Sequence, residues 1–279
     1  MFDRPVYFVR PCFVEDFAAT FADVADAGIK RVVLGARMGN VDFLDRQLFS
    51  LAQGILRQLK LQAVAAHGLL SGHFDLNEPD PEFRSHSIQS HRVFMNHMAE
   101  LGCRTYVCHP GQASPSCSRS VSWDWVRRTL DELAPTAEEL GLTVALENAN
   151  PGHLGDNAAE LLGFVEAYGC DRVRICYDSG HAHRAEDAAS VLRTLTPLVV
   201  TAHLHDNDKS ADQHLIVGRG TIDWKTVVPL LRQCPELIHI ETEAFNTEKW
   251  PHGDVYRRYR EMLSEPTQPP NAPSRAGDV

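Results

Sequence analysis

Short apolar runs alternate with longer amphipathic segments along most of this chain. Most of these runs are continuous stretches of valine, isoleucine, leucine and alanine, which is typical of parallel strands covered on both faces. The pattern therefore predicts eight buried strands. They cover residues 5–9, 31–35, 61–67, 105–109, 142–147, 173–178, 198–205 and 237–241.

Between these runs the apolar positions recur at helical spacing, and glycine ends several of the segments, as at Gly28 and Gly102. Pro135 lies inside the fourth helical segment and should kink or split it. Eight strand–helix units in alternation favour a closed barrel over an open doubly wound sheet. Neither GxGxxG nor a P-loop follows the first strand. We therefore expect the α/β class, as a single (β/α)8 TIM barrel with its active site at the C-terminal ends of the strands.

Length and composition agree with one domain. The chain has 279 residues, and a (β/α)8 barrel takes about 250. We assign 1–263 to the barrel. Residues 264–279 are rich in proline and poor in apolar side chains, so we expect a disordered tail without catalytic function.

Cysteine usage and charge narrow the functional class. Seven cysteines without CxxC spacing suit a reducing compartment better than a disulfide framework. The chain lacks an apolar run long enough to span a bilayer and a signal-peptide start, so we expect a cytoplasmic protein. A net charge of −10 argues against broad binding to nucleic acid or anionic membranes. The sequence leaves the oligomeric state open, including a homo-oligomer.

The last four predicted strands each carry, at or within two residues of their C-terminal end, a residue that can bind a metal ion. These residues are Glu147, Asp178, His203 and Glu241. A carboxylate at a strand end can also cap the next helix or pair with an arginine. Its recurrence on successive strands favours a site for a hard or borderline divalent cation at the mouth of the barrel.

Further histidines and an aspartate occupy comparable positions. His67 and His109 end earlier strands, whereas His181, Asp212 and His214 follow just beyond strand ends. We expect them to line the same mouth as second-metal ligands or substrate contacts. His203 and His205 lie two residues apart, so both can face one side of a strand.

Several ordered motifs resemble the xylose isomerase-like TIM-barrel superfamily. They are HPG at 109–111, LEN at 146–148, YDSGHAH at 177–183, HLHDND at 203–208, DQH with GRG at 212–220 and IET at 240–242. The resemblance covers about 5–260. That superfamily includes sugar (phosphate) isomerases and epimerases, inosose dehydratases and AP endonucleases of the endonuclease IV type.

The resemblance implies two ligand patterns. In the ketose epimerase pattern, one divalent ion (Mn2+, Zn2+, Co2+ or Mg2+) binds the four strand-end residues. Glu147 and Glu241 then form an acid–base pair around an enediolate, and His181 holds the substrate. In the endonuclease IV pattern, three zinc ions share nine ligands. These are His67, His109 and Glu147; Glu147, Asp178, His203 and Glu241; and His181, Asp212 and His214.

Three departures favour sugar chemistry. The loops at 36–40 and 68–74 lack the Arg and Tyr pair with which endonuclease IV-type enzymes enter the base stack, and the net charge gives no basic stripe for a duplex. The stretch at 212–224 also resembles sugar epimerases more closely. We expect a metal-dependent isomerase or epimerase of a sugar or sugar phosphate. The alternatives are a multi-zinc phosphodiesterase and an inosose-type dehydratase.

Overall fold

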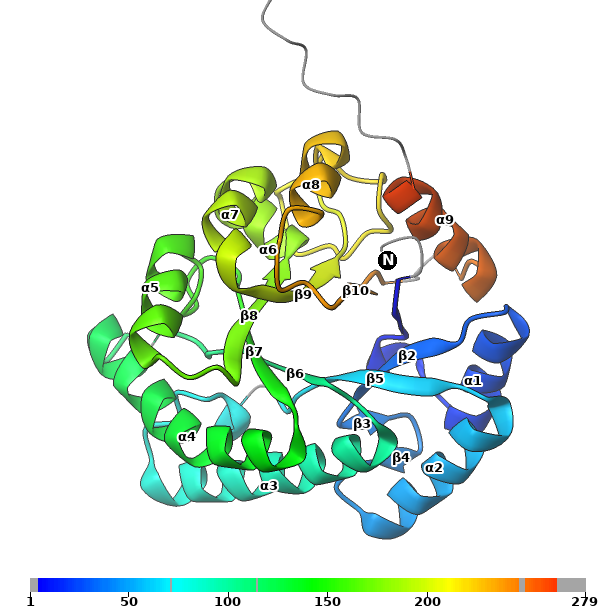
Figure 1. Ribbon diagram of the computed structural model, residues 1–279, viewed down its shortest axis with the longest axis horizontal. Coiled ribbons are helices and arrows are strands. Elements are labelled where there is room, and N and C mark those ends of the chain that lie inside the picture. Colours follow the sequence, from blue (N-terminus) through cyan, green and yellow to red (C-terminus); the bar gives the residue numbers. More distant parts are fainter. Residues whose placement is uncertain (1–4, 71, 114, 246–248, 265–279) are drawn as a thin grey trace, which may run out of the picture.

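Eight parallel strands form a barrel at the centre of the molecule, with helices around it (Figure 1). The computed structural model describes residues 5–70, 72–113, 115–245 and 249–264. The strands are neighbours in chain order, which confirms the predicted fold class. They are β1 (Tyr7–Phe8), β2 (Arg31–Gly35), β5 (Gln62–His67), β6 (Thr105–Cys108), β7 (Thr143–Glu147), β8 (Val173–Asp178), β9 (Val199–Leu204) and β10 (His239–Thr242).

The first and last strands meet and close the barrel. Val6 pairs in parallel with Glu241. Its amide donates to the carbonyl of Ile240 at 2.7 Å, and its carbonyl accepts from the amide of Thr242 at 2.9 Å. Closure brings the residues that follow β1 beside those that follow β10.

Helices cover the outside of the barrel, and an acidic, asparagine or serine N-cap begins most of them. The Asp45 side chain, for example, accepts hydrogen bonds from the first turn of the second helix. The helices are α1 (Phe17–Asp26), α2 (Arg46–Leu59), α3 (Pro81–Leu101), α4 (Arg119–Leu140), α5 (Ala158–Tyr168), α6 (Ser179–Ala185), α7 (Ala188–Leu195), α8 (Trp224–Leu231) and α9 (His252–Ser264). Single 3-10 turns lie at Pro11–Phe13, Gly72–Phe74 and Thr196–Leu198.

Alternation along the strands divides the core into two regions. Side chains such as Leu146 and Tyr177 pack outward against the helices. A small inner cluster of Val6, Phe8, Val33 and Ala65 fills part of the barrel interior. Polar side chains replace apolar ones toward the C-terminal ends, and this replacement defines the mouth.

The structure corrects the predicted elements in a few places. Pro135 does not divide its helix, since α4 runs continuously past it. A short antiparallel pair joins β3 (Arg37–Met38) to β4 (Val41–Asp42), and β4 occupies the first two residues of the second predicted helical segment, whose helix α2 begins only at Arg46. Ser264 ends α9 rather than opening the tail, and the rest of the predicted tail lies outside the described residues.

All seven cysteines are free thiols. Among the described helices, none combines the length and the apolar character needed to cross a bilayer.

Candidate active site

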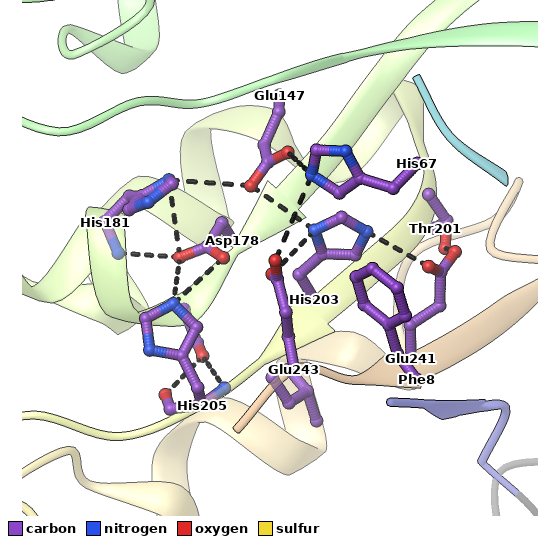
Figure 2. Close-up of polar contacts among 12 residues, drawn as sticks. Phe8, His67, Glu147, Asp178, His181, Thr201, His203, His205, Glu241 and Glu243 are labelled. Carbon is purple, nitrogen blue, oxygen red and sulfur yellow. Dashed lines mark hydrogen bonds and ion pairs between the residues drawn. The ribbon is translucent and has the colours of Figure 1, made fainter. Parts of the chain in front are cut away.

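Acidic and imidazole side chains from several strands converge at the C-terminal mouth of the barrel (Figure 2). His67, Glu147 and Asp178 are the last residues of β5, β7 and β8. Each has no more than 4% of its surface exposed. The predicted strand ends therefore deliver these side chains to one place.

Three groups of described residues have ligand atoms that lie within 4.8 Å of one another. Carboxylates and imidazoles packed this closely are the donor set of a divalent cation site. The groups are Glu147, Asp178, His203 and Glu243; His67, Glu147 and His203; and His181, His205, Asp212 and His214.

The His203 ring lies between three glutamates. Its Nδ1 is 3.3 Å from Oε1 of Glu147 and 2.8 Å from Oε2 of Glu243. Its Nε2 faces the other way and is 3.1 Å from Oε2 of Glu241. His203 thus separates a mouth side, which holds Glu147 and Glu243, from an inner side, which holds Glu241 (Figure 2).

Glu241 is bonded on both of its oxygens by the protein. Thr201 Oγ1 donates to Oε1 at 2.7 Å, and Nε2 of His239 is 2.9 Å from the same oxygen. Glu241 belongs to none of the three groups of converging ligand atoms. The structure therefore does not bring it together with Glu147 and Asp178, and its role as ligand and base stays a prediction.

Glu243 and His205 are the site residues that the sequence-based assignment omitted. Each lies two residues beyond a predicted ligand and directly follows the last residue of its strand, closer to the mouth. Nε2 of His205 is 3.1 Å from both carboxylate oxygens of Asp178. The spacing of two residues was the signal that could have found them.

His181, His214 and Asp212 form one arm of the site. Nδ1 of His181 donates to the carbonyl of Asn148 at 2.9 Å, and Nδ1 of His214 donates to the carbonyl of Glu243 at 3.0 Å. Their Nε2 atoms are left 3.4 and 3.1 Å from Oδ2 of Asp212. A backbone carbonyl that fixes one ring nitrogen while the other faces the site is the usual arrangement around metal-binding histidines.

His67 and His109 lie on the other side of Glu147. Their Nε2 atoms are 3.8 and 3.0 Å from Oε2 of that carboxylate. Both histidines therefore lie beside Glu147 at the mouth. Of the nine residues in the endonuclease IV pattern, Glu241 is set apart, because within this set it contacts only the inner ring nitrogen of His203.

Opposite charges hold the acids of the site ionised. Burial alone would raise the pKa of Glu147, but the charges of His203 and His109 outweigh it and keep that pKa well below its usual value. Burial would lower the pKa of His181, yet Asp178 and Asp212 raise it to about 10. His67 behaves differently, because burial and the neighbouring His109 lower its pKa to about 4.

Among the described residues, several buried carboxylate oxygens of this cluster accept no hydrogen bond of good geometry. They include Oε2 of Glu147, Oε2 of Glu243 and Oδ1 of Asp212. A buried carboxylate oxygen without a hydrogen bond is costly unless another group compensates it. A divalent ion fits this donor set, since it would supply the missing partner for several oxygens at once.

Curated proteins with related sequences carry both kinds of name expected from the motifs. The uncharacterized protein MJ1311 of Methanocaldococcus jannaschii is 29% identical over 175 residues, which are 60% of this chain and 59% of that protein. A D-psicose 3-epimerase of Enterocloster bolteae is 25% identical over 141 residues, 50% of this chain and 45% of that protein. A probable endonuclease 4 of Campylobacter concisus is 24% identical over 174 residues, 58% and 61% respectively. The matches span less than two thirds of each of these relatives.

Solved structures share the fold over nearly the whole chain. A D-tagatose 3-epimerase-like protein superposes with a TM-score of 0.77 at 19% identity, over 92% of this chain and 98% of that one. A 3-keto-D-glucoside 4-epimerase from E. coli gives 0.77 at 17% identity, over 93% and 98%. The sequence pattern of one family matches residues 21–265. The chain belongs to the xylose isomerase-like TIM barrel family.

Proposed function

We propose that this chain is a divalent-metal-dependent isomerase or epimerase of a small sugar or sugar phosphate. The observation that carries the proposal is the convergence of Glu147, Asp178, His203 and Glu243 at the barrel mouth. The epimerase names of the curated relative and of the two solved structures support the choice of a carbohydrate.

Glu147, Asp178 and Glu243 would hold the ion, with His203 or His205 as the nitrogen ligand. A bound Mn2+, Co2+, Zn2+ or Mg2+ would polarise a substrate carbonyl and its neighbouring hydroxyl, which lowers the free energy of the enediolate. The ligand set replaces the predicted Glu241 by Glu243, because the ligand atoms of Glu243 converge with those of Glu147, Asp178 and His203, whereas Glu241 belongs to no such group.

The two remaining tasks are to remove a proton and to return it. Glu147 and Glu243 come from β7 and from the end of β10, and both face the mouth side of His203. One carboxylate would take the proton beside the carbonyl, and the other would return one to the opposite face or to the adjacent carbon. Positioned groups of this kind contribute about 10²–10⁴-fold to the rate.

His181 would hold the substrate. The Asn148 carbonyl fixes its ring, and its Nε2 points toward Asp212 at the mouth. A protonated imidazole in this position donates a hydrogen bond to a substrate hydroxyl or to the developing oxyanion.

Solvent exchange tests the reaction. The protein is incubated in D2O with Mn2+ or Co2+ and a panel of ketoses and their phosphates, and deuterium at the carbon beside the carbonyl is measured by NMR. We expect incorporation with the wild type and none with Glu147→Gln. Absence of exchange on every sugar, together with metal-dependent cleavage of another substrate class, would overturn the proposal.

A second candidate is a multi-zinc phosphodiesterase. Two observations favour it. The ligand atoms of His181, Asp212 and His214 converge in a group apart from the one around Glu147 and Asp178. In addition, His67 and His109 both lie beside Glu147. The relative named probable endonuclease 4 is consistent with it. Elemental analysis separates the candidates, because the isomerase requires one ion per chain and this alternative three. Zinc-dependent nicking of an abasic duplex would decide for the phosphodiesterase.

The dehydratase alternative uses the same enediolate. It predicts loss of water from the substrate instead of simple exchange. Product analysis by mass spectrometry in the D2O experiment distinguishes a dehydrated product from an epimer or isomer.

A further inference from the structure

Arg10 contacts the candidate site from the opposite end of the chain. It follows β1, and barrel closure places it beside the end of β10. One guanidinium nitrogen forms an ion pair with Oε1 of Glu243. The arginine side chain is 21% exposed, whereas the glutamate is 2% exposed, so Arg10 reaches the carboxylate from the rim.

Two stacks of rings run from Arg10 to the histidines of the site. The guanidinium carbon lies 5.1 Å from the centre of the Phe245 ring. Phe245 stacks on His214 at 4.5 Å, and His214 stacks on His205 at 3.8 Å, both with planes 17° apart. The first stack therefore ends at a nitrogen donor of the site.

The second stack begins on the Phe8 ring, whose centre is 5.8 Å from the guanidinium carbon of Arg10. Phe8 stacks on His67 at 5.8 Å, and His67 stacks on His203 at 5.5 Å. Arg10 thus contacts the proposed ligand Glu243 directly. It also begins two ring stacks, one of which ends at His205 and the other at His203, the two candidate nitrogen ligands.

We propose that Arg10 is a positioning residue of the metal site, an inference that rests on the proposed metal-dependent function. It holds the Glu243 carboxylate in its direction and, through Phe245 and His214, holds the ring plane of His205. An arginine suits this task because its planar fork can pair with a carboxylate while its face lies on an aromatic ring. Outer contacts of this kind typically change metal affinity by about 10–100-fold when they are removed.

The test compares Arg10→Met with a matched control, Arg46→Met. Arg46 also pairs with a glutamate, Glu100, at 2.7 Å and lies over a phenylalanine ring, Phe49, at 5.1 Å. It belongs to α2 on the outside of the barrel. The measurements are Co2+ affinity by calorimetry, the visible absorption of bound Co2+, and thermal unfolding without metal.

We expect Arg10→Met to weaken Co2+ binding by about 10–100-fold and to change the Co2+ spectrum. Arg46→Met should leave both unchanged. Arg10→Lys keeps the charge but loses the fork and the ring contact, so its affinity should fall between wild type and Arg10→Met. A structural role alone would lower the unfolding temperature but leave the spectrum of the folded protein unchanged.

Phe245→Leu provides a second measurement should Arg10→Met fail to fold, since it removes the ring between Arg10 and His214 without touching a charge. The inference about Arg10 would be overturned if Arg10→Met kept a Co2+ affinity within about threefold of wild type and an unchanged Co2+ spectrum. If Arg10→Met does not fold, the same result in Phe245→Leu would overturn it. In either case the proposed function would still stand. A wild-type protein that binds no Co2+, Mn2+ or Zn2+ would overturn the proposed function itself.

Discussion

Nδ1 of His203 lies 2.8 Å from Oε2 of Glu243, on the side of the ring that faces the barrel mouth. Glu241, two residues earlier on the same strand face, contacts the opposite ring nitrogen at 3.1 Å. The two glutamates therefore differ in what surrounds them. Oε2 of Glu243 lies close to Nδ1 of His203 but makes no aligned hydrogen bond in the described part of the chain, whereas Glu241 is hydrogen-bonded on both oxygens.

This difference separates the two variants Glu243→Gln and Glu241→Gln. The first removes the charge of a proposed ligand and base, so metal affinity should fall and solvent exchange should drop at least about 10²-fold. The second removes a partner of Thr201, His239 and Nε2 of His203 rather than a proposed ligand, so it should weaken metal binding less than the first and should cost about 1–3 kcal/mol of stability. Isotope exchange and urea unfolding measure the two effects. The reverse result would restore Glu241 as the base.

The sequence did not decide which of these two glutamates lies at the mouth with Glu147. Apolar runs and helix-ending glycines are local features, so they predicted eight strand–helix units. Which of two residues on one strand face lies level with Glu147 depends on the stagger between strands. The register shifts between Ile175 and Cys176 where β8 pairs with β9, and periodicity does not reveal such a shift.

Asp212 and His214 were placed at the mouth by motif rather than by periodicity, because they lie in a long loop. The loop conformation depends on Asp206, a buried carboxylate. Its oxygens accept hydrogen bonds from the backbone amides of Gly218 and Ile222 and from the Trp224 indole. A network of this kind arises only in the folded chain.

Removal of metal should lower stability and abolish exchange. A ligand at about 100 times its Kd stabilises the folded state by about 2.7 kcal/mol. For a chain of this size we expect unfolding roughly 5–10 °C lower after chelation. Differential scanning calorimetry before chelation, after it and after addition of Mn2+ measures the change. Identical unfolding temperatures in all three states would contradict a bound ion.

Gly180 has no side chain, and the His205 ring occupies the space that a methyl group at this position would fill. A Cβ atom at this position would lie 1.9 Å from Cε1 of His205. Gly180→Ala should therefore displace the ring from Asp178, weaken Co2+ binding and cost about 1–3 kcal/mol of stability. Gly163→Ala on α5 is the matched control, because a Cβ there meets nothing within 4 Å. Equal Co2+ affinity of both variants would argue against a ligand role for His205.

Asp206→Asn should loosen the loop that carries Asp212 and His214. The amide cannot accept at both positions, so at least one of the buried N–H donors loses its partner. We expect a loss of about 3 kcal/mol and a change in Trp224 fluorescence, since that indole donates to Asp206 at 2.8 Å. Asp208→Asn is the control, because Asp208 is exposed on the same loop and should change stability by less than about 0.5 kcal/mol. Similar losses in the two variants would contradict the role of Asp206.

His91 lies outside the candidate active site and should make the fold sensitive to acid. It is fully buried on α3, where Nε2 donates to the Phe74 carbonyl at 3.0 Å. Nδ1 then accepts from the Tyr106 hydroxyl at 2.7 Å. Burial lowers the pKa of His91 from 6.5 to about 4, although the bond to Phe74 partly opposes this. The folded protein therefore holds the neutral ring.

Because the folded pKa lies below the unfolded one, protonation favours the unfolded chain. The contribution of His91 is complete above pH 6.5 and is lost as the pH falls toward 4, by at most about 3 kcal/mol. His91→Gln cannot take up this proton. Urea unfolding from pH about 7 to about 4.5 should show it less stable than wild type at neutral pH, with a gap that narrows on acidification. A gap that stays constant over this range would mean that His91 is not held neutral by its burial.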